Sequence, residues 1–122
     1  MRVLGVDHVN LRVPPDLEAA CLAFYGGTLG LAPIPKPAEL AKRGGGWFQA
    51  GAQQLHISLE KGADGAQSQR HVCLLVDDLD TALDHVRRAG IALDEGVSEA
   101  EGLRRFFIRD PAGNRIEIAS RD

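Results

Sequence analysis

The sequence predicts an α+β fold made of two βαβββ modules, and the main evidence is an internal repeat. Residues 7–13 and residues 70–76 each place a histidine before alternating apolar side chains, which is the pattern of a half-buried strand. The two histidines, His8 and His71, are 71 − 8 = 63 residues apart. Two similar halves of about sixty residues therefore account for nearly the whole chain.

Each predicted first strand is followed by a predicted helix. Asp16 and Asp78 stand directly before the first apolar residues of these helices, where a carboxylate can cap free backbone N–H groups. Gly30 and Gly90 are expected to end the helices. Apolar side chains recur near helical spacing in both segments. They are Leu17, Ala20, Cys21, Phe24 and Leu29 in the first, and Leu79, Leu83, Val86 and Ala89 in the second.

Each half is predicted to end in a pair of strands joined by a tight turn. The expected strands are residues 47–50 and 54–59 in the first half, and residues 105–109 and 115–119 in the second. Residues 110–114 (Asp-Pro-Ala-Gly-Asn) are rich in turn formers and predict a hairpin. A short strand over residues 92–94 is expected to complete the second module. Its counterpart near residues 33–34 lies among three prolines, which weaken a strand.

The chain length favours one domain, with residues 1–62 as module one and residues 69–122 as module two. A net charge of −3 argues against a nucleic-acid surface, and no apolar run is long enough for a membrane span. We therefore expect a small-molecule partner, no nucleic-acid or membrane partner, and a cytoplasmic location. Cys21 and Cys73 are too few for a disulfide framework and are expected to be buried free thiols.

Strand alternation places four possible metal ligands on the faces opposite the apolar side chains. They are His8, His56, His71 and Glu117, each in a strand interior. Histidine and carboxylate are the usual donors for divalent transition metals. The pairs follow the repeat, because His8 matches His71 and His56 matches Glu117, 117 − 56 = 61 residues later. The pattern predicts that the four converge on one divalent metal ion, although each alone would be typical of a solvated strand residue. His85, outside the apolar stripe of its helix, is expected to face solvent.

With these residues in place, the sequence resembles the vicinal oxygen chelate superfamily, the glyoxalase, bleomycin-resistance and dioxygenase group. The resemblance covers almost the full length and depends on the order of several short motifs. These are Asp7-His8-Val9, Phe24-Tyr25, Leu29-Gly30-Leu31, Arg70-His71-Val72 and, most specific of all, the closing residues 109–117. It implies two paired glyoxalase-like modules that form an eight-stranded cup with the helices outside. It also implies a divalent metal ion (Zn, Ni, Mn or Fe) on His8, His56, His71 and Glu117, and a homodimer.

Position 56 departs from the pattern of this family. Glyoxalase I-like members usually have a glutamate there, and epimerase-like members tend to have a glutamine, whereas this chain has His56. His8, His71 and Glu117 would supply the two-histidine, one-carboxylate set of dioxygenase and fosfomycin-resistance members. The histidine at position 56 therefore argues against plain glyoxalase I activity.

The leading hypothesis is a metal-dependent lyase or isomerase acting on a small oxygenated substrate chelated by the metal. The metal would act as a Lewis acid, Glu117 would transfer a proton, and His56 would be a ligand or share the proton transfer. Four further side chains are candidates for binding the substrate, the arginines through an anionic group on it: Arg12, Arg105, Arg115 and Trp47.

Two other functions are compatible with the same sequence. One is an Fe(II)-dependent dioxygenase that uses His8, His71 and Glu117 as a facial triad. The other is a metal-free binding protein of the bleomycin-resistance kind, against which the intact ligand set argues. Residues 33–46 are expected to form a lid over the site or a simple loop. Their run Gly44-Gly45-Gly46 lacks the Lys-Ser/Thr that a phosphate-binding P-loop needs.

Overall fold

The computed structural model describes residues 1–122 and divides the chain into two compact units. Unit 1 is Met1–Asp64 and unit 2 is Gly65–Asp122, so the division falls between the ends of the two predicted modules. None of the helices combines the length and the apolar character that crossing a bilayer requires.

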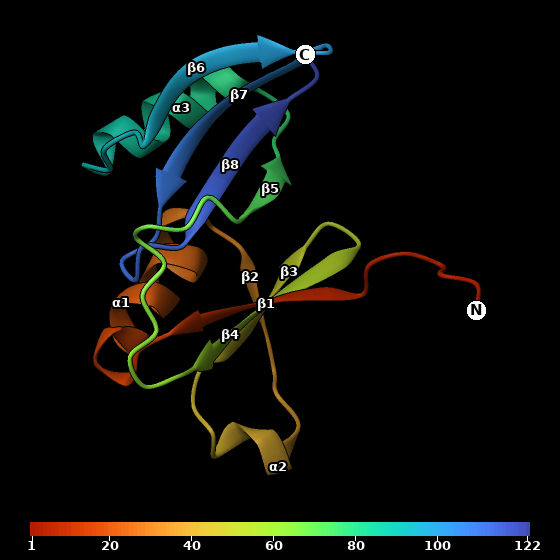
Figure 1. The fold of residues 1–122 in the computed structure, drawn as a ribbon, viewed down its shortest axis with the longest axis vertical. Coiled ribbons are helices and arrows are strands. Elements are labelled where there is room, and N and C mark those ends of the chain that lie inside the picture. Colours follow the sequence, from red (N-terminus) through yellow and green to blue (C-terminus); the bar gives the residue numbers. More distant parts are fainter. The chain divides into compact units, whose positions relative to one another are not determined.

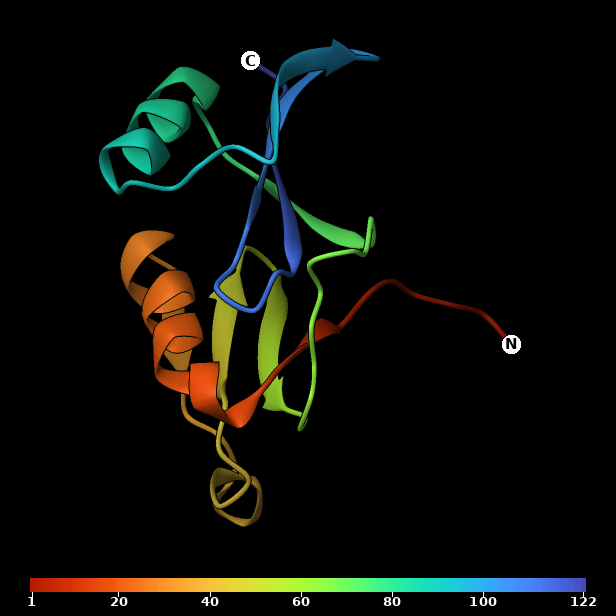
Figure 2. The ribbon, with the colours of Figure 1, turned by 60° about the vertical axis from the view of Figure 1, so that its left-hand side comes forward.

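Unit 1 is a four-stranded sheet with a helical segment packed on one of its faces (Figures 1 and 2). Its elements are β1 (His8–Val13), η1 (Pro15–Leu17), α1 (Glu18–Leu22), η2 (Ala23–Thr28), β2 (Ala32–Ile34), α2 (Ala38–Ala41), β3 (Gly46–Ala50) and β4 (Gln53–Leu59). The strand order is β1-β4-β3-β2. β1 runs parallel to β4, and the other two pairings are antiparallel.

Unit 2 repeats this arrangement around a second sheet. Its elements are β5 (His71–Leu75), α3 (Leu79–Arg88), β6 (Glu95–Ala100), β7 (Leu103–Arg109) and β8 (Arg115–Ser120). The strand order is β5-β8-β7-β6, with β5 parallel to β8 and the remaining pairs antiparallel. Because the order and the directions match those of unit 1, the predicted α+β fold of two βαβββ modules is confirmed.

In each unit the apolar side chains of the strands pack on the helical side of the sheet. The buried set in unit 1 includes Val13, Cys21, Phe24, Tyr25, Phe48, Leu55 and Ile57; in unit 2 it includes Leu79, Val86, Phe106, Ile108, Ile116 and Ile118. Neighbouring residues of a strand point to opposite faces. His56, between Leu55 and Ile57, and Glu117, between Ile116 and Ile118, therefore lie on the faces away from the helices.

The first helical segment is less regular than predicted. A 3-10 turn, a short α-helix and a π-helical turn follow one another from Pro15 to Thr28. The prediction that Asp16 caps this segment is wrong, because the N-cap is Pro14, which has no side-chain acceptor. The cap of α3 is confirmed, since the Asp78 carboxylate accepts hydrogen bonds from two backbone N–H groups at 3.0 and 3.2 Å.

The strand predicted over residues 92–94 lies instead at β6, Glu95–Ala100. Every residue of β6 is exposed, so its sequence carries none of the apolar alternation by which a strand is recognised. Pairing with β7 creates the strand, with Ser98 opposite Arg105. Asp94, just before β6, donates its backbone N–H to the Phe107 carbonyl at 2.7 Å.

The predicted hairpin between β7 and β8 is confirmed, and Asp110 organises its turn. The buried Asp110 carboxylate accepts hydrogen bonds from the backbone N–H groups of Ala112 and Asn114, both at 2.9 Å. It also accepts one from Asn114 Nδ2 at 3.0 Å. The turn sets the register in which Phe107 lies opposite Glu117.

Candidate functional site

Three rings are stacked on the face of the unit 1 sheet that lies away from α1. The His56 ring lies between Trp47, at a centroid distance of 4.0 Å, and His8, at 4.2 Å. The interplanar angles are 4° and 14°. The strand register places Trp47 directly opposite His56. His56 is 6% exposed, whereas His8 lies at the surface.

A hydrogen bond and burial define the state of His56. Its Nε2 donates to Gln54 Oε1 at 2.9 Å in the tautomer protonated at Nε2. Burial, and then the nearby His8, lower the pKa of His56. His56 is therefore a neutral imidazole at neutral pH, the form that binds a metal ion or accepts a proton.

In unit 2 the corresponding face brings His71 and Glu117 into contact. His71 Nε2 lies 2.9 Å from Glu117 Oε2, and Arg105 Nη1 lies 3.4 Å from Oε1 of the same carboxylate. Glu117 is 4% exposed. The Phe107 ring meets the His71 ring edge-on at a centroid distance of 5.3 Å. The carboxylate is thus held on both oxygens by side chains from neighbouring strands.

Cys73 lies opposite Glu117 on β5. The prediction that it is buried is wrong, because strand alternation puts Cys73 on the face shared with His71, while Cys21 is buried as predicted. Partial burial of the thiol, and then the Glu117 carboxylate, raise the pKa of Cys73. Both cysteines are free thiols, as expected.

The two surface histidines each have one ring nitrogen already bound. His71 Nδ1 lies 3.0 Å from the Gln69 carbonyl, which only accepts, so Nδ1 carries a proton. In the neutral ring Nε2 then holds a lone pair that faces a Glu117 oxygen 2.9 Å away. Two facing acceptors require a shared proton or a cation between them. His8 repeats half of this arrangement, because its Nδ1 lies 2.9 Å from Asp7 Oδ2.

The chemistry of these donors fits a divalent metal ion. Metal-binding histidines commonly donate their other N–H to a carbonyl or a carboxylate, as His8 and His71 do here. His71 Nε2 and Glu117 Oε2 lie 2.9 Å apart, so two side chains of metal-ligand type face one place.

The predicted ligands occur as two pairs, one in each unit. His8 and His56 belong to unit 1, and His71 and Glu117 belong to unit 2. Neither unit by itself gathers three potential ligands. The rings of His8 and His56 are nearly parallel, so the exposed His8 ring has to turn before both can point at one ion. The convergence of all four on one ion stays a prediction.

The two candidate arginines of unit 2 have different surroundings. Arg115 Nε lies 2.9 Å from Asp94 Oδ2, and its guanidinium lies 3.6 Å from the centre of the Phe107 ring. Arg115 therefore has internal partners. Arg105 contacts Glu117 but keeps a buried Nε that has no hydrogen-bond partner. Both stay candidates for substrate binding.

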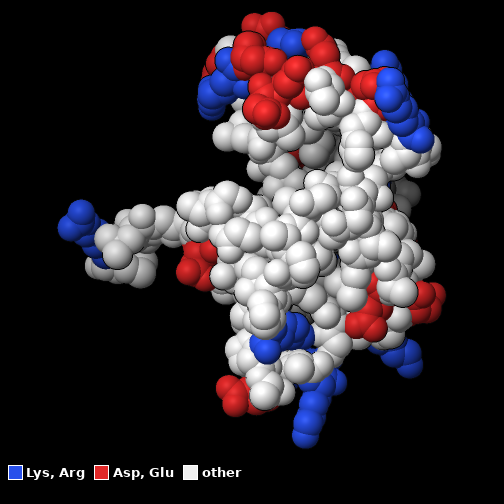
Figure 3. Space-filling view, turned by 180° about the vertical axis from the view of Figure 1, so that it is seen from behind, with Lys and Arg blue, Asp and Glu red and all other residues white.

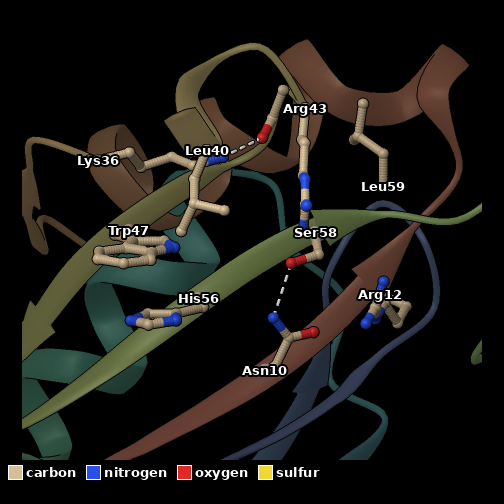
Figure 4. Close-up of a pocket in the computed structure, with 10 residues that line it drawn as sticks. Asn10, Arg12, Lys36, Leu40, Arg43, Trp47, His56, Ser58 and Leu59 are labelled. Atoms are coloured by element: carbon tan, nitrogen blue, oxygen red, sulfur yellow. Dashed lines mark hydrogen bonds between the residues drawn. The ribbon is translucent and has the colours of Figure 1, made fainter. Parts of the chain in front are cut away.

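A pocket of about 280 Å³ opens on the ring-bearing face of unit 1 (Figure 4). The predicted substrate-binding residues Arg12 and Trp47 line it together with His56. Sequence reasoning missed two further lining cations, Lys36 and Arg43, which lie on either side of α2. No strand alternation covers these two positions, although both fall within residues 33–46, the segment that was expected to form a lid over the site or a simple loop.

The chain consists of two βαβββ units. Each unit carries histidine or carboxylate side chains on the sheet face away from its helix, which is the arrangement of a two-module metal-binding fold. The chain belongs to the Glyoxalase/Bleomycin resistance protein/Dioxygenase superfamily, whose family model matches residues 5–118. The sequence-based assignment to this group is confirmed, and no curated protein matches the chain.

Solved structures show the same fold over the whole chain. A protein from Bacillus anthracis assigned to the glyoxalase family is 37% identical, with a TM-score of 0.90 and 100% of both chains covered. A lactoylglutathione lyase from Agrobacterium tumefaciens is 22% identical, with a TM-score of 0.75, covering 98% of this chain and 95% of its own. A glyoxalase/dioxygenase from Nostoc punctiforme is 24% identical, with a TM-score of 0.78 and coverages of 96% and 90%. The last two likenesses concern the fold alone.

Proposed function

We propose that this protein is a metal-dependent lyase or isomerase that acts on a small oxygenated substrate. The observation that carries the proposal is the close approach of two side chains of metal-ligand type, with His71 Nε2 2.9 Å from Glu117 Oε2. The proton on His71 Nδ1 is committed to a carbonyl, so the Nε2 lone pair and the carboxylate together offer a binding edge to a cation. His8 and His56 would complete the ligand set.

The side chains around this edge have separate tasks in the proposed reaction. The metal ion, when bound, supplies a Lewis acid that polarises an oxygen of the substrate. Glu117 accepts a proton from the substrate, and Arg105 keeps the carboxylate in position through its 3.4 Å contact. His56 is neutral at neutral pH, so it can bind or take up a proton beside Trp47.

We also propose that the protein is a homodimer. The residues before β1 extend away from the sheet of unit 1 (Figure 2) and expose Val3 and Leu4 by 75% and 87%. In unit 2, Leu75 on the edge strand β5 is 66% exposed. Members of the superfamily often form dimers, and a second chain could cover these apolar side chains. Light scattering of the purified chain tests this, and replacement of Leu4 by Ser should shift a dimer toward monomer.

Metal analysis of the purified protein tests the proposed function. The wild type should carry about one equivalent of a divalent ion. Glu117→Ala should lose it, because one oxygen of the binding edge disappears, and His56→Ala should bind it more weakly. His85→Ala is the matched control, since His85 is exposed on α3, outside the predicted site, and its loss should leave the metal content unchanged.

Two outcomes would contradict the proposal. Equal metal content in the wild type and in both site variants would remove these residues from the metal site. A wild type that neither holds metal nor gains thermal stability from added Zn²⁺, Ni²⁺ or Mn²⁺ would favour a metal-free binding protein instead. If Fe²⁺ alone supports activity, the dioxygenase alternative replaces the lyase or isomerase.

A further inference from the structure

The pocket of unit 1 is lined by three cationic side chains that come from separate parts of the chain. Arg12 belongs to β1, Lys36 follows β2, and Arg43 follows α2. The side chains of Arg12 and Arg43 extend toward Ser58 on β4 (Figure 4). Basic and acidic side chains are both visible on the surface at the end of unit 1 that carries α2 (Figure 3). The pocket therefore concentrates positive charge in one concave place.

No carboxylate lines this pocket. Lys36 and Arg43 form no ion pair, and the Lys36 ammonium donates to the Gly44 carbonyl, which leaves its charge uncompensated. The Glu18 carboxylate, behind the wall of the pocket, accepts a hydrogen bond from the Gly45 backbone N–H at 2.5 Å. By contrast, the arginines 104, 109 and 115 of unit 2 are each paired with aspartates or glutamates. The charges of Lys36 and Arg43, which no ion pair compensates, favour an anionic ligand.

Ser58 adds a neutral donor between the arginines. Its Oγ accepts a hydrogen bond from Asn10 Nδ2 at 2.7 Å, so its own hydroxyl hydrogen is directed elsewhere. A hydroxyl beside two guanidinium groups is well suited to the oxygens of a phosphate or a carboxylate, which arginine binds through parallel N–H groups.

The opposite wall of the pocket is apolar. It consists of the Trp47 ring and Leu40, and the Trp47 ring is held in place by its stacking on His56 at 4.0 Å. The volume of about 280 Å³ lies at the lower end of the range for small-molecule sites. The pocket thus has room for one charged group and a small apolar body.

We propose that this pocket binds a small organic oxyanion, with its phosphate or carboxylate group at Arg12, Arg43 and Ser58 and its apolar part against Trp47. This inference rests on the proposed function, because His56 belongs to both sites, and it names the class of substrate. It assigns Lys36 and Arg43, from the segment around α2, to substrate binding.

Trp47 provides a direct measurement because it is the single tryptophan of the chain. Its fluorescence is recorded while phenyl phosphate, benzoate or benzyl alcohol is added, in buffer freed of metal ions by a chelating resin. We expect a saturable change with phenyl phosphate, with benzoate or with both, and a much weaker response to the neutral alcohol. Tighter binding of phenyl phosphate would identify the natural group as a phosphate, and tighter binding of benzoate would identify it as a carboxylate.

Arg43→Ala and Lys42→Ala form a matched pair of variants. Both positions are exposed neighbours at the end of α2, and each loses one positive charge, but only Arg43 lines the pocket. Arg43→Ala should weaken the binding of the preferred anion about tenfold, the effect of losing one charge-assisted hydrogen bond. Lys42→Ala should change the binding less than twofold, because an exposed charge at this distance is screened by salt.

Three results would overturn this inference. They are a response to benzyl alcohol equal to that of the anions, no saturable response to either anion, and equal weakening by the two variants. Because the resin removes metal from these titrations, failure of the anion site is read from fluorescence and failure of the metal site from metal content. Each can therefore fail while the other stands.

Discussion

The turn between β7 and β8 depends on one buried carboxylate, and its removal should destabilise unit 2. Asp110 is 4% exposed and accepts three hydrogen bonds, two from backbone N–H groups and one from Asn114 Nδ2. Asp110→Ala leaves these donors without an acceptor in a partly buried turn. Each bond to a charged acceptor is worth about 1.5–3 kcal/mol, but the donors partly regain water. We therefore expect a loss of about 3 kcal/mol in the free energy of unfolding.

This loss is large compared with the stability of a domain of this size, which is about 5–15 kcal/mol. It corresponds to a decrease of about 10 °C in Tm. Asp110→Asn keeps one carbonyl oxygen that can accept both backbone N–H groups, so it should lose about 1 kcal/mol. The turn also fixes the register that places Glu117 opposite Phe107. Asp110→Ala should therefore weaken metal binding as well.

Urea and thermal unfolding followed by circular dichroism measure these differences. Asp84→Ala is the control, because Asp84 is exposed on α3 and forms only a surface ion pair with Arg88. That variant should change the stability by less than about 0.5 kcal/mol. If Asp110→Ala is as stable as Asp84→Ala, the assignment of the turn to the carboxylate is refuted.

Three further predictions follow from local geometry and charge. Hydrogen bonds from Arg115 and a second arginine lower the pKa of Asp94, so the stability that they provide is present above about pH 4 and lost as the pH falls further. The destabilisation caused by Asp94→Asn should therefore be larger at pH 6 than at pH 3. An equal effect at both pH values would contradict this prediction. Gly45 and Gly51 both have positive φ, of +76° and +62°, but an added Cβ would lie 2.0 Å from a backbone carbonyl oxygen at Gly45 and in open space at Gly51. Gly51→Ala should therefore lower the free energy of unfolding by about 1 kcal/mol. Gly45→Ala should unfold at a clearly lower urea concentration than Gly51→Ala. Cys73 is the accessible thiol of the chain, and partial burial of its sulfur raises its pKa. Iodoacetamide should therefore label one thiol per chain, slowly near neutral pH and faster as the pH rises, as followed by mass spectrometry. Labelling that is already at its full rate at neutral pH would argue against the raised pKa.

The strand positions and faces of residues within a clear alternating pattern were predicted correctly. The repeat around His8 and His71 and the alternation around His56 and Glu117 lie within single strands, where each side chain takes one of two faces. The strand order then follows from two similar modules. Two predictions from weaker patterns were wrong. Pro14, and not Asp16, occupies the cap position of the first helical segment, and the strand predicted over residues 92–94 lies at β6, where every residue is exposed.

Sequence alone therefore determined the repeated α+β fold and the faces on which the four predicted metal ligands lie. Only the tertiary structure decided which side chains meet. Arg105 reaches Glu117, and Trp47 stacks on His56, because the register between antiparallel strands brings together residues that are not neighbours in the chain. Lys36 and Arg43 reach the pocket because the chain turns back around α2. Strand or helix periodicity in a sequence does not predict the path of such a loop.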